Sequence, residues 1–221
     1  IYATTITEMG LGMSEVEVAQ MMLKDVAQRG LTAAWAENSC PCVNVGAESA
    51  LGHASPKDLR IQKGMIVHFD FGVRENDYCS DLQRVVYFLR DGETDAPAAV
   101  KHGFSTVVRA LEAAVAAMKP GVTGEEVDAI ARRMVMEAGY PEFKHATGHQ
   151  LGLETHDGGT VLGPAWERYG STPFGRLEAG QVFAVEPSLV VPGYGIIGIE
   201  EDVLVTEEGT VYLSTPQKEI I

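Results

Sequence analysis

Acidic residues stand inside apolar, strand-like segments at four places in the chain, and their carboxylates are the first candidates for chemistry. They are Asp70, Asp81, Glu186 and Glu200. In an antiparallel hairpin, the numbers of two facing residues average to the centre of the turn. Asp70 and Asp81 average to a point within residues 74–77, and Glu186 and Glu200 average to Gly193. The spacing therefore predicts two pairs of facing carboxylates, with about 5 Å between the Cβ atoms of each pair.

Facing carboxylates repel one another, and burial of an uncompensated charge is costly. Such pairs are neutralised either by a proton shared between carboxylates or by divalent cations bound to their oxygens. A cluster of histidines favours the second arrangement, because His145, His149 and His156 fall within twelve residues. Four carboxylates and one imidazole suit two divalent ions that share a water as nucleophile. The sequence therefore predicts a dinuclear metal centre.

Two segments 109 residues apart begin with the same S/T-x-x-E pattern, at Ser14 and at Thr123. This capping box satisfies free backbone N–H groups at the start of a helix. Gly30 and Gly139 stand where a left-handed residue would end each helix. The pattern predicts two amphipathic helices of similar length. The repeat also predicts two halves of related topology, at about 1–95 and 96–221.

Each of these helices is followed by two segments rich in β-branched and aromatic residues, with turn-forming residues between them. The paired segments are residues 65–73 with 78–89, and residues 181–191 with 195–206. An alanine-rich segment over residues 96–118 predicts a further helix ahead of the second capping box. Helices combined with antiparallel hairpins indicate an α/β (α+β) fold.

The balance of charge limits the partners that the chain can have. Its 221 residues include 31 Asp and Glu against 17 Lys and Arg, which gives a formal net charge of −14. This charge repels nucleic-acid phosphates and anionic lipid headgroups, so we expect neither as a partner. The three cysteines lack a second Cys or His pair that would complete a zinc site. Free thiols indicate a reducing compartment, and we expect the cytoplasm.

The beginning of the chain bears on its domain organisation. Only eleven residues precede Gly12, whereas the equivalent glycine of the second half follows a long helix, and the chain begins with Ile1 rather than Met. We expect residues 1–221 to form a single catalytic domain from which an upstream segment or domain is absent.

The candidate residues resemble the five-ligand pattern of the pita-bread metallopeptidases, a family that includes methionine and Xaa-Pro aminopeptidases, prolidases and creatinase-like hydrolases. The matching positions are Asp70, Asp81, Thr147-Gly148-His149, Val185-Glu186-Pro187 and Ile199-Glu200-Glu201. The resemblance implies a pita-bread fold, in which two pseudo-twofold halves form a curved sheet of antiparallel hairpins covered by helices. We also expect a homodimer.

The resemblance implies a role for each ligand. Asp70 would bind one ion, and Asp81 and Glu200 would bridge both ions. His149 and Glu186 would bind the other ion, and Glu186 would also act as the general acid/base for the proton of the nucleophile. Mn is the expected metal, although Co, Zn and Fe also suit one imidazole with four carboxylates.

Glu200 and Glu201 are adjacent, and only one of them can occupy the last ligand position. The turn-centre arithmetic and the following strand select Glu200, and alternation along the strand points Glu201 to the opposite face. Arg84 is the expected partner of Glu201.

Three further histidines match active-site histidines of the Xaa-Pro aminopeptidase and prolidase branch: His53, His145 and His156. An imidazole at such a place can donate a hydrogen bond to a developing oxyanion. His68 and His102 match no motif of the family and are assigned structural or surface roles.

The chain departs from the proline-specific pattern at three positions. Gly198 stands where these members usually carry Arg, while Ser188 and Gly52 stand where Gly and Pro are common. We expect a metal-dependent aminopeptidase or dipeptidase that hydrolyses the N-terminal peptide bond of short peptides, with Xaa-Pro bonds as candidates. The alternatives are a creatinase-like hydrolase or lyase acting on a small amide or zwitterion, and a protein-binding pseudoenzyme. Retention of all five ligands argues against the pseudoenzyme.

Overall fold

The computed structural model describes residues 1–49 and 55–221. Its α-helices within these ranges are α1 (Tyr2–Glu8), α2 (Glu15–Gln28), α3 (Ala98–Ala117) and α4 (Gly124–Glu137). Two short 3₁₀ helices, η1 (Glu167–Tyr169) and η2 (Thr172–Phe174), follow α4 in the chain. None of the described helices is long and apolar enough to cross a membrane.

The strands of the first half are β1 (Thr32–Ala33), β2 (Cys42–Val45), β3 (Ile66–Phe71), β4 (Val73–Glu75), β5 (Tyr78–Cys79) and β6 (Leu82–Tyr87). Those of the second half are β7 (Gly148–Gln150), β8 (Val161–Leu162), β9 (Val182–Val185), β10 (Ser188–Val191), β11 (Gly195–Gly198), β12 (Glu201–Thr206) and β13 (Gly209–Tyr212). All their pairings are antiparallel.

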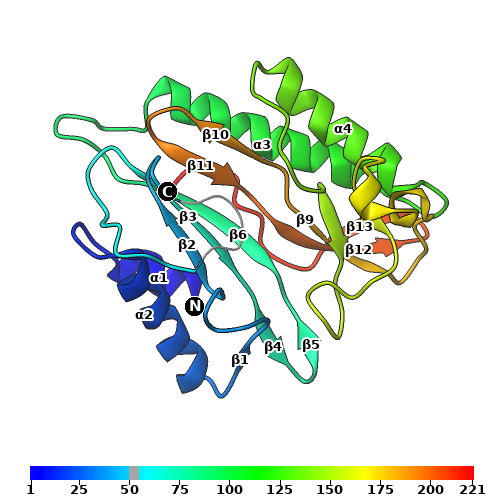
Figure 1. Ribbon diagram of the computed structural model, residues 1–221, viewed down its shortest axis with the longest axis horizontal. Coiled ribbons are helices and arrows are strands. Elements are labelled where there is room, and N and C mark those ends of the chain that lie inside the picture. Colours follow the sequence, from blue (N-terminus) through cyan, green and yellow to red (C-terminus); the bar gives the residue numbers. More distant parts are fainter. Residues whose placement is uncertain (50–54) are drawn as a thin grey trace.

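The strands lie between two pairs of helices (Figure 1). In the first half the strand order is β2-β3-β6, and α2 packs on β2. In the second half the order is β13-β12-β9-β7-β8, and α3 packs on the separate hairpin of β10 and β11. The two halves meet where β11 contacts β3 and β6. Side chains at this junction are therefore drawn from both halves.

Local sequence accounts for the two repeated helices. Ser14 and Thr123 are the N-caps of α2 and α4, and both capping boxes form as predicted. Gly30 and Gly139 follow the helices with φ angles of 71° and 91°, in the left-handed region that glycine tolerates. The helices begin 109 residues apart and are both 14 residues long. The predicted repeat of helices is thus confirmed.

Alternation along β3 decides which side chains face the junction between the halves. Val67, Phe69 and Phe71 pack into the apolar cluster formed with α1 and α2. Because successive side chains of a strand point to opposite faces, His68 and Asp70 face the other way, on the side of Ile66. Ile66 belongs to the second cluster, which is formed with α3 and α4. Two polar side chains are therefore directed into the interior between the halves.

The register predicted for the first hairpin was wrong. Asp70 pairs with Gln83, not with Asp81. The turn consists of Asn76 and Asp77, both with positive φ, and two such residues are what a tight type I′ hairpin turn requires. The centre of the turn therefore lies one residue later than the midpoint of Asp70 and Asp81, and the facing residue moves by two positions.

The register predicted for the second hairpin is confirmed. Gly198 pairs with Ser188 on one side of the acids, and Glu201 pairs with Val185 on the other, which is the same register. Between these pairs the ladder is interrupted at Glu186 and Glu200. The predicted continuous strands are therefore each divided in two, and the two acids face one another at the interruption.

Candidate metal centre

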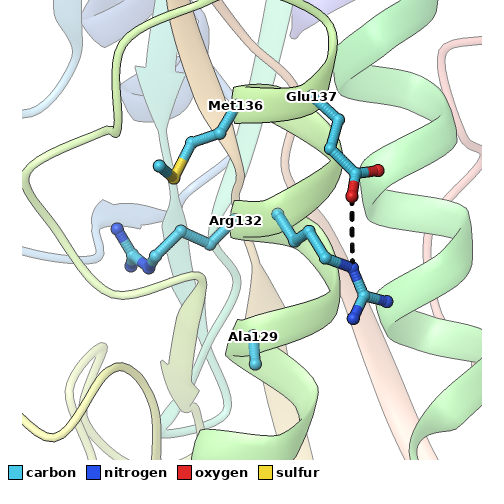
Figure 2. A pocket seen from close by; sticks show the side chains of 5 residues that line it. Ala129, Arg132, Met136 and Glu137 are labelled. Atoms are coloured by element: carbon cyan, nitrogen blue, oxygen red, sulfur yellow. Dashed lines mark ion pairs between the residues drawn. The ribbon is translucent and has the colours of Figure 1, made fainter.

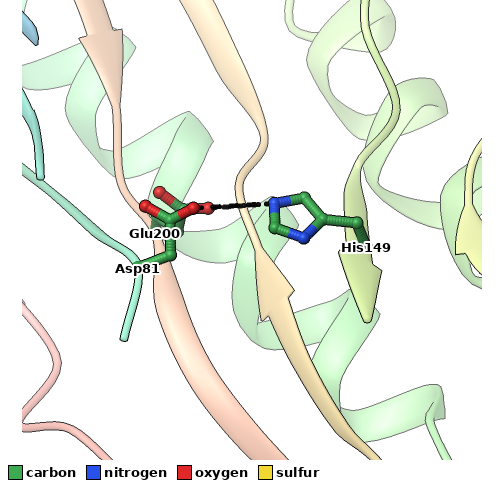
Figure 3. Close-up of side chains that lie close together, drawn as sticks. All are labelled: Asp81, His149 and Glu200. Carbon is green, nitrogen blue, oxygen red and sulfur yellow. Dashed lines mark ion pairs between the residues drawn. The ribbon is translucent and has the colours of Figure 1, made fainter. Parts of the chain in front are cut away.

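Asp81, His149 and Glu200 are buried and direct their side chains at one point (Figure 3). Nε2 of His149 lies 3.7 Å from Oδ2 of Asp81 and 4.0 Å from Oε1 of Glu200. One ligand atom from each residue lies within 4.8 Å of the others, and no second group of this kind occurs in residues 1–49 and 55–221. Two carboxylates and an imidazole that converge in this way form a candidate site for a cation.

Two further acids complete the group that the sequence selects. Oε1 of Glu186 lies 3.9 Å from Nε2 of His149. Asp70 lies close enough that its charge raises the pKa values of Asp81, Glu186 and Glu200. The five residues come from both halves of the chain: Asp70 and Asp81 from the first, and the other three from the second.

The donor set fits divalent cations. Oδ1 of Asp81 and both carboxylate oxygens of Glu200 are buried and accept no hydrogen bond from the described residues. Buried acceptors with no donor are costly, and oxygen-rich sites with one imidazole suit Mn, Co, Zn or Fe. A cation among these oxygens would compensate both the missing hydrogen bonds and the mutual repulsion.

The pKa values reflect the crowding of the acids. Burial, followed by the charge of Asp70, raises the pKa of Glu186 to about 8, while a hydrogen bond from Gln83 lowers it. Burial and then neighbouring carboxylates raise the pKa values of Asp81 and Glu200 well above their ordinary values. The centre therefore favours proton uptake unless another positive charge is supplied.

Asp202 is a component of this environment that sequence reasoning missed. Its Oδ2 accepts a hydrogen bond of 3.1 Å from the backbone N–H of Asp81, and burial raises its pKa to about 7. It fixes the backbone at Asp81 rather than joining the converging atoms. Its place two residues after Glu200, in an apolar strand, was the available signal.

A buried ion pair on α4 fixes the segment that leads to His149. Asp128 accepts hydrogen bonds from the N–H and hydroxyl of Thr147, at 3.1 and 2.8 Å, and pairs with Arg132. Arg132 also donates to the carbonyl of His145. The carbonyl of Thr147 in turn accepts a hydrogen bond of 2.7 Å from the N–H of Glu186. Two members of the centre are thus tied to one helix.

Comparison with known proteins identifies the family. The model of Metallopeptidase family M24 matches residues 1–207. The chain belongs to metallopeptidase family M24. An uncharacterized peptidase of Staphylococcus saprophyticus is 41% identical over 174 residues, which are 78% of this chain and 46% of that protein. An uncharacterized peptidase of Staphylococcus aureus is 35% identical over 208 residues, 94% of this chain and 55% of that protein.

Solved structures place the M24 chain in the expected fold. An X-Pro aminopeptidase from Thermotoga maritima superposes with a TM-score of 0.86 at 32% identity, over 100% of this chain and 58% of that one. A Xaa-Pro dipeptidase from Bacillus anthracis gives 0.86 at 31% identity, with the same coverage of both chains. The predicted pita-bread fold is confirmed. The chain spans about half the length of the curated relatives that it matches.

Glu201 serves the M24 fold as a structural residue, as the sequence predicts. Its Oε1 lies 3.0 Å from Nη1 of Arg84, and its side chain has no exposed surface. Arg84 also donates a hydrogen bond to the backbone carbonyl of Glu200. The pair therefore fixes the backbone at Glu200, directly before β12.

The additional histidines occupy different surroundings in this M24 chain. His156 is exposed, and its ring centroid lies 4.2 Å from that of His149. Nε2 of His145 lies 2.7 Å from the hydroxyl of Ser188. His53 lies outside the described residues. His102 is an exposed residue of α3 that stacks on Tyr140.

His68 is not a surface residue but one of the most buried polar residues, with 3% of its surface exposed. Its two ring nitrogens lie close to Asn44 of β2 and Gln83 of β6.

A hollow lies on the surface of α4 (Figure 2). It is lined by Ala129, Arg132, Arg133, Met136 and Glu137. Arg133 and Glu137 form an exposed ion pair one helical turn apart, at 3.9 Å. None of the converging acids or the imidazole contributes to its lining, so the chemistry is assigned to the buried cluster.

Proposed function

We propose that this M24 chain is the catalytic part of a dinuclear metal-dependent peptidase that hydrolyses the N-terminal peptide bond of short peptides. The supporting observation is the convergence of Asp81, Glu200 and His149, with carboxylate oxygens of the first two left without hydrogen-bond donors among the described residues. A binding protein has no need of buried acids that a cation must compensate. Metal-dependent hydrolysis, in contrast, uses a cation held by such acids.

The proposed ligands are Asp70, Asp81, His149, Glu186 and Glu200. Asp70 would hold one ion, and Asp81 and Glu200 would lie between two. His149 and Glu186 would hold the other, and the distance of 3.9 Å between them is compatible with a shared ion. Divalent ions there would make water a nucleophile at neutral pH and polarise the scissile carbonyl. We propose Mn as the metal.

Glu186 is the proposed general acid/base. Its side chain keeps 16% of its surface exposed, whereas those of Asp81 and Glu200 keep 2% and 1%. Among these three acids it is therefore the one that can reach both the centre and an incoming substrate. It would take the proton of the attacking water and deliver it to the leaving amine.

Histidines around the centre are proposed to bind the substrate. The exposed His156, whose ring lies tilted against that of His149, would donate a hydrogen bond to the scissile carbonyl as negative charge develops. His145, held against Ser188, would line the same side of the centre. The role of His53 rests on the family resemblance alone.

We propose that the enzyme prefers peptide bonds that precede proline. Two of the similar structures are named an X-Pro aminopeptidase and a Xaa-Pro dipeptidase. Gly198 departs from the pattern of proline-specific members, so short peptides without proline belong in the same test. We also propose that the chain forms a homodimer and that it acts in the cytoplasm.

A panel of synthetic peptides tests the proposed function. Mn²⁺-loaded protein is incubated with Xaa-Pro and Xaa-Ala dipeptides, with longer peptides and with creatine-like amides, and products are identified by mass spectrometry. We expect release of the N-terminal residue by the wild type and at least about 100-fold slower release by Glu186→Gln. Turnover of the amides without cleavage of any peptide would favour the creatinase-like alternative instead.

A further inference from the structure

Gln83 is the residue that links the acids of the two hairpins. It faces Asp70 across β3 and β6, and its backbone forms an isolated bridge with Glu200. Its side-chain Nε2 donates a hydrogen bond of 3.0 Å to Oε2 of Glu186. One buried amide therefore touches the acid that is proposed to carry the proton, although it is not itself a metal ligand.

The amide of Gln83 is held from its other end. Its Oε1 lies 2.9 Å from Nε2 of His68, and Nδ1 of His68 lies 3.0 Å from Oδ1 of Asn44. Oε1 of Gln83 and Oδ1 of Asn44 can both only accept, so both ring nitrogens of His68 stand where a donor is needed, and a proton on Nε2 keeps the NH₂ end of the Gln83 amide directed at Glu186. The exposed fractions of Asn44, His68 and Gln83 are 3%, 3% and 5%. Water therefore has little access to this row of side chains.

The row continues to helix α2. Asn44 donates to the hydroxyl of Ser49 at 3.1 Å, and Ser49 donates to Glu15 at 2.6 Å. Glu15 is buried on α2 and also accepts a hydrogen bond from the N–H of Val45. Glu186, in the second half of the chain, is thus connected through hydrogen-bonded side chains to a helix of the first half.

Gly198 leaves the space that these side chains fill. A Cβ atom at position 198 would lie 2.2 Å from Oε1 of Gln83 and 2.8 Å from Nε2 of His68. Both distances are far below ordinary contact. A side chain at this position and the present placement of Gln83 exclude one another.

We propose that Gln83, held by His68, is a positioning residue for the Glu186 carboxylate, and that position 198 is glycine because these two side chains occupy its side-chain space. The inference rests on the metal centre of the proposed function. The hydrogen bond to Oε2 leaves Oε1, the oxygen that faces His149, for an ion and for the proton. Residues that orient metal ligands commonly change metal affinity or activity by 10- to 100-fold when they are removed.

Gln83→Met removes the amide while keeping the length of the side chain, and Gln217→Met is the matched control. Gln217 is equally buried, at 7%, and bonds to the backbone of β6 at Val85 without touching Glu186. Mn²⁺ binding to chelator-treated protein is measured by calorimetry, and kcat and KM are measured with a peptide that the wild type cleaves.

For Gln83→Met we expect Mn²⁺ binding weakened by about 10-fold or more, and kcat lowered by about 10-fold or more with KM changed less than about threefold. The control should keep wild-type Mn²⁺ affinity, even if it unfolds at a lower temperature. Wild-type Mn²⁺ affinity in Gln83→Met would overturn the proposal.

Gly198→Ala tests the same placement without deleting a polar group. The atoms in its way are the ends of side chains, so the protein should fold with Gln83 displaced. We expect the Mn²⁺ affinity of Gly198→Ala to fall as in Gln83→Met, and the double variant to lose little more than either single one. Additive losses would contradict a shared origin. If the wild type itself binds no Mn²⁺ and cleaves no peptide, the proposed function fails, whereas normal wild-type behaviour with unaffected variants rejects only this inference.

Discussion

His149 Nε2 lies 3.7 Å from Asp81 Oδ2, and the two residues belong to different halves of the chain. The first half contributes only acids to the converging group, and the single imidazole comes from the second. A cation bound between them would therefore join the halves, and it would bind the folded chain much more tightly than the unfolded one. Such binding stabilises the folded state by mass action.

Mn²⁺ should accordingly raise the stability of the wild type. At a free concentration 100 times the dissociation constant, one ion adds about 2.7 kcal/mol to the free energy of unfolding. His149→Ala should lose most of this gain, whereas His102→Ala, at an exposed histidine of α3, should keep it. Urea unfolding with and without Mn²⁺ measures the effect. If Mn²⁺ does not change the free energy of unfolding of the wild type, the proposed metal centre is contradicted.

Glu200→Gln should distinguish the effect of this acid on the stability of the metal-free protein from its contribution to Mn²⁺ binding. In chelator-treated protein the substitution should leave stability unchanged or raise it, because it removes an ionisable group buried beside Asp81 and Glu186. The same variant should lose most of the stabilisation by Mn²⁺. A clear loss of stability in the presence of chelator, seen by thermal unfolding, would show that Glu200 has a structural role instead.

The stability of chelator-treated protein should fall as pH rises from about 5 to about 8. The folded-state pKa values of Glu186 and Asp202, about 8 and about 7, lie above their ordinary values of 4.5 and 3.8. Between these limits the folded chain binds more protons than the unfolded chain, so the free energy of unfolding decreases with pH.

Acids with lowered pKa values titrate below this window and do not offset the trend; they are Glu17, Asp25, Asp95 and Glu126. Urea unfolding at three pH values measures the slope, and saturating Mn²⁺ should reduce it. Stability that increases with pH across this window would contradict the raised pKa values.

Asp128→Ala should destabilise the chain by about 3 kcal/mol or more, because it removes the closer carboxylate partner of the buried Arg132 and leaves it only Glu142, at 3.5 Å. Arg133→Ala is the matched control on the same helix. Its ion pair with Glu137 is more than half exposed and should matter by less than about 0.5 kcal/mol. Since Asp128 also holds Thr147, Mn²⁺ affinity should fall in the first variant and not in the control. Equal effects of the two substitutions would exclude the supporting role of Asp128.

His156→Ala should lower kcat with little effect on Mn²⁺ binding. The side chain is exposed and contacts the ring of His149 without belonging to the converging group. Loss of one hydrogen bond to a developing oxyanion costs about 100-fold in rate. Steady-state kinetics and calorimetry on the same preparation give both quantities, and an unchanged kcat would remove His156 from the reaction.

Features that depend on neighbouring residues were predictable from the sequence. The capping boxes at Ser14 and Thr123 start helices because the donor and acceptor groups lie three residues apart. The second hairpin was placed correctly because Gly193 marks its turn. The four acids could be selected because charged residues within apolar strands require compensation, and His149 because Thr147-Gly148-His149 resembles the family's pattern.

Features that depend on fine register or on packing were not predictable. The choice of a two-residue turn at Asn76 and Asp77, rather than a four-residue loop, moved the partner of Asp70 from Asp81 to Gln83. The sequence assigns His68 only a structural or surface role, because its contacts are with Asn44 and Gln83, which lie on other strands. The contacts of such side chains follow from the arrangement of the strands in space, which the sequence pattern alone does not give.

The number of divalent ions held by each chain tests the central claim most directly. Chelator-treated wild type is titrated with Mn²⁺, and bound metal is counted after removal of free ions. Two ions per chain are expected for the wild type, with at most one strongly bound ion for Glu200→Gln. A folded wild type that retains no Mn²⁺, Co²⁺, Zn²⁺ or Fe²⁺ would contradict the assignment of Asp70, Asp81, His149, Glu186 and Glu200 as a metal centre.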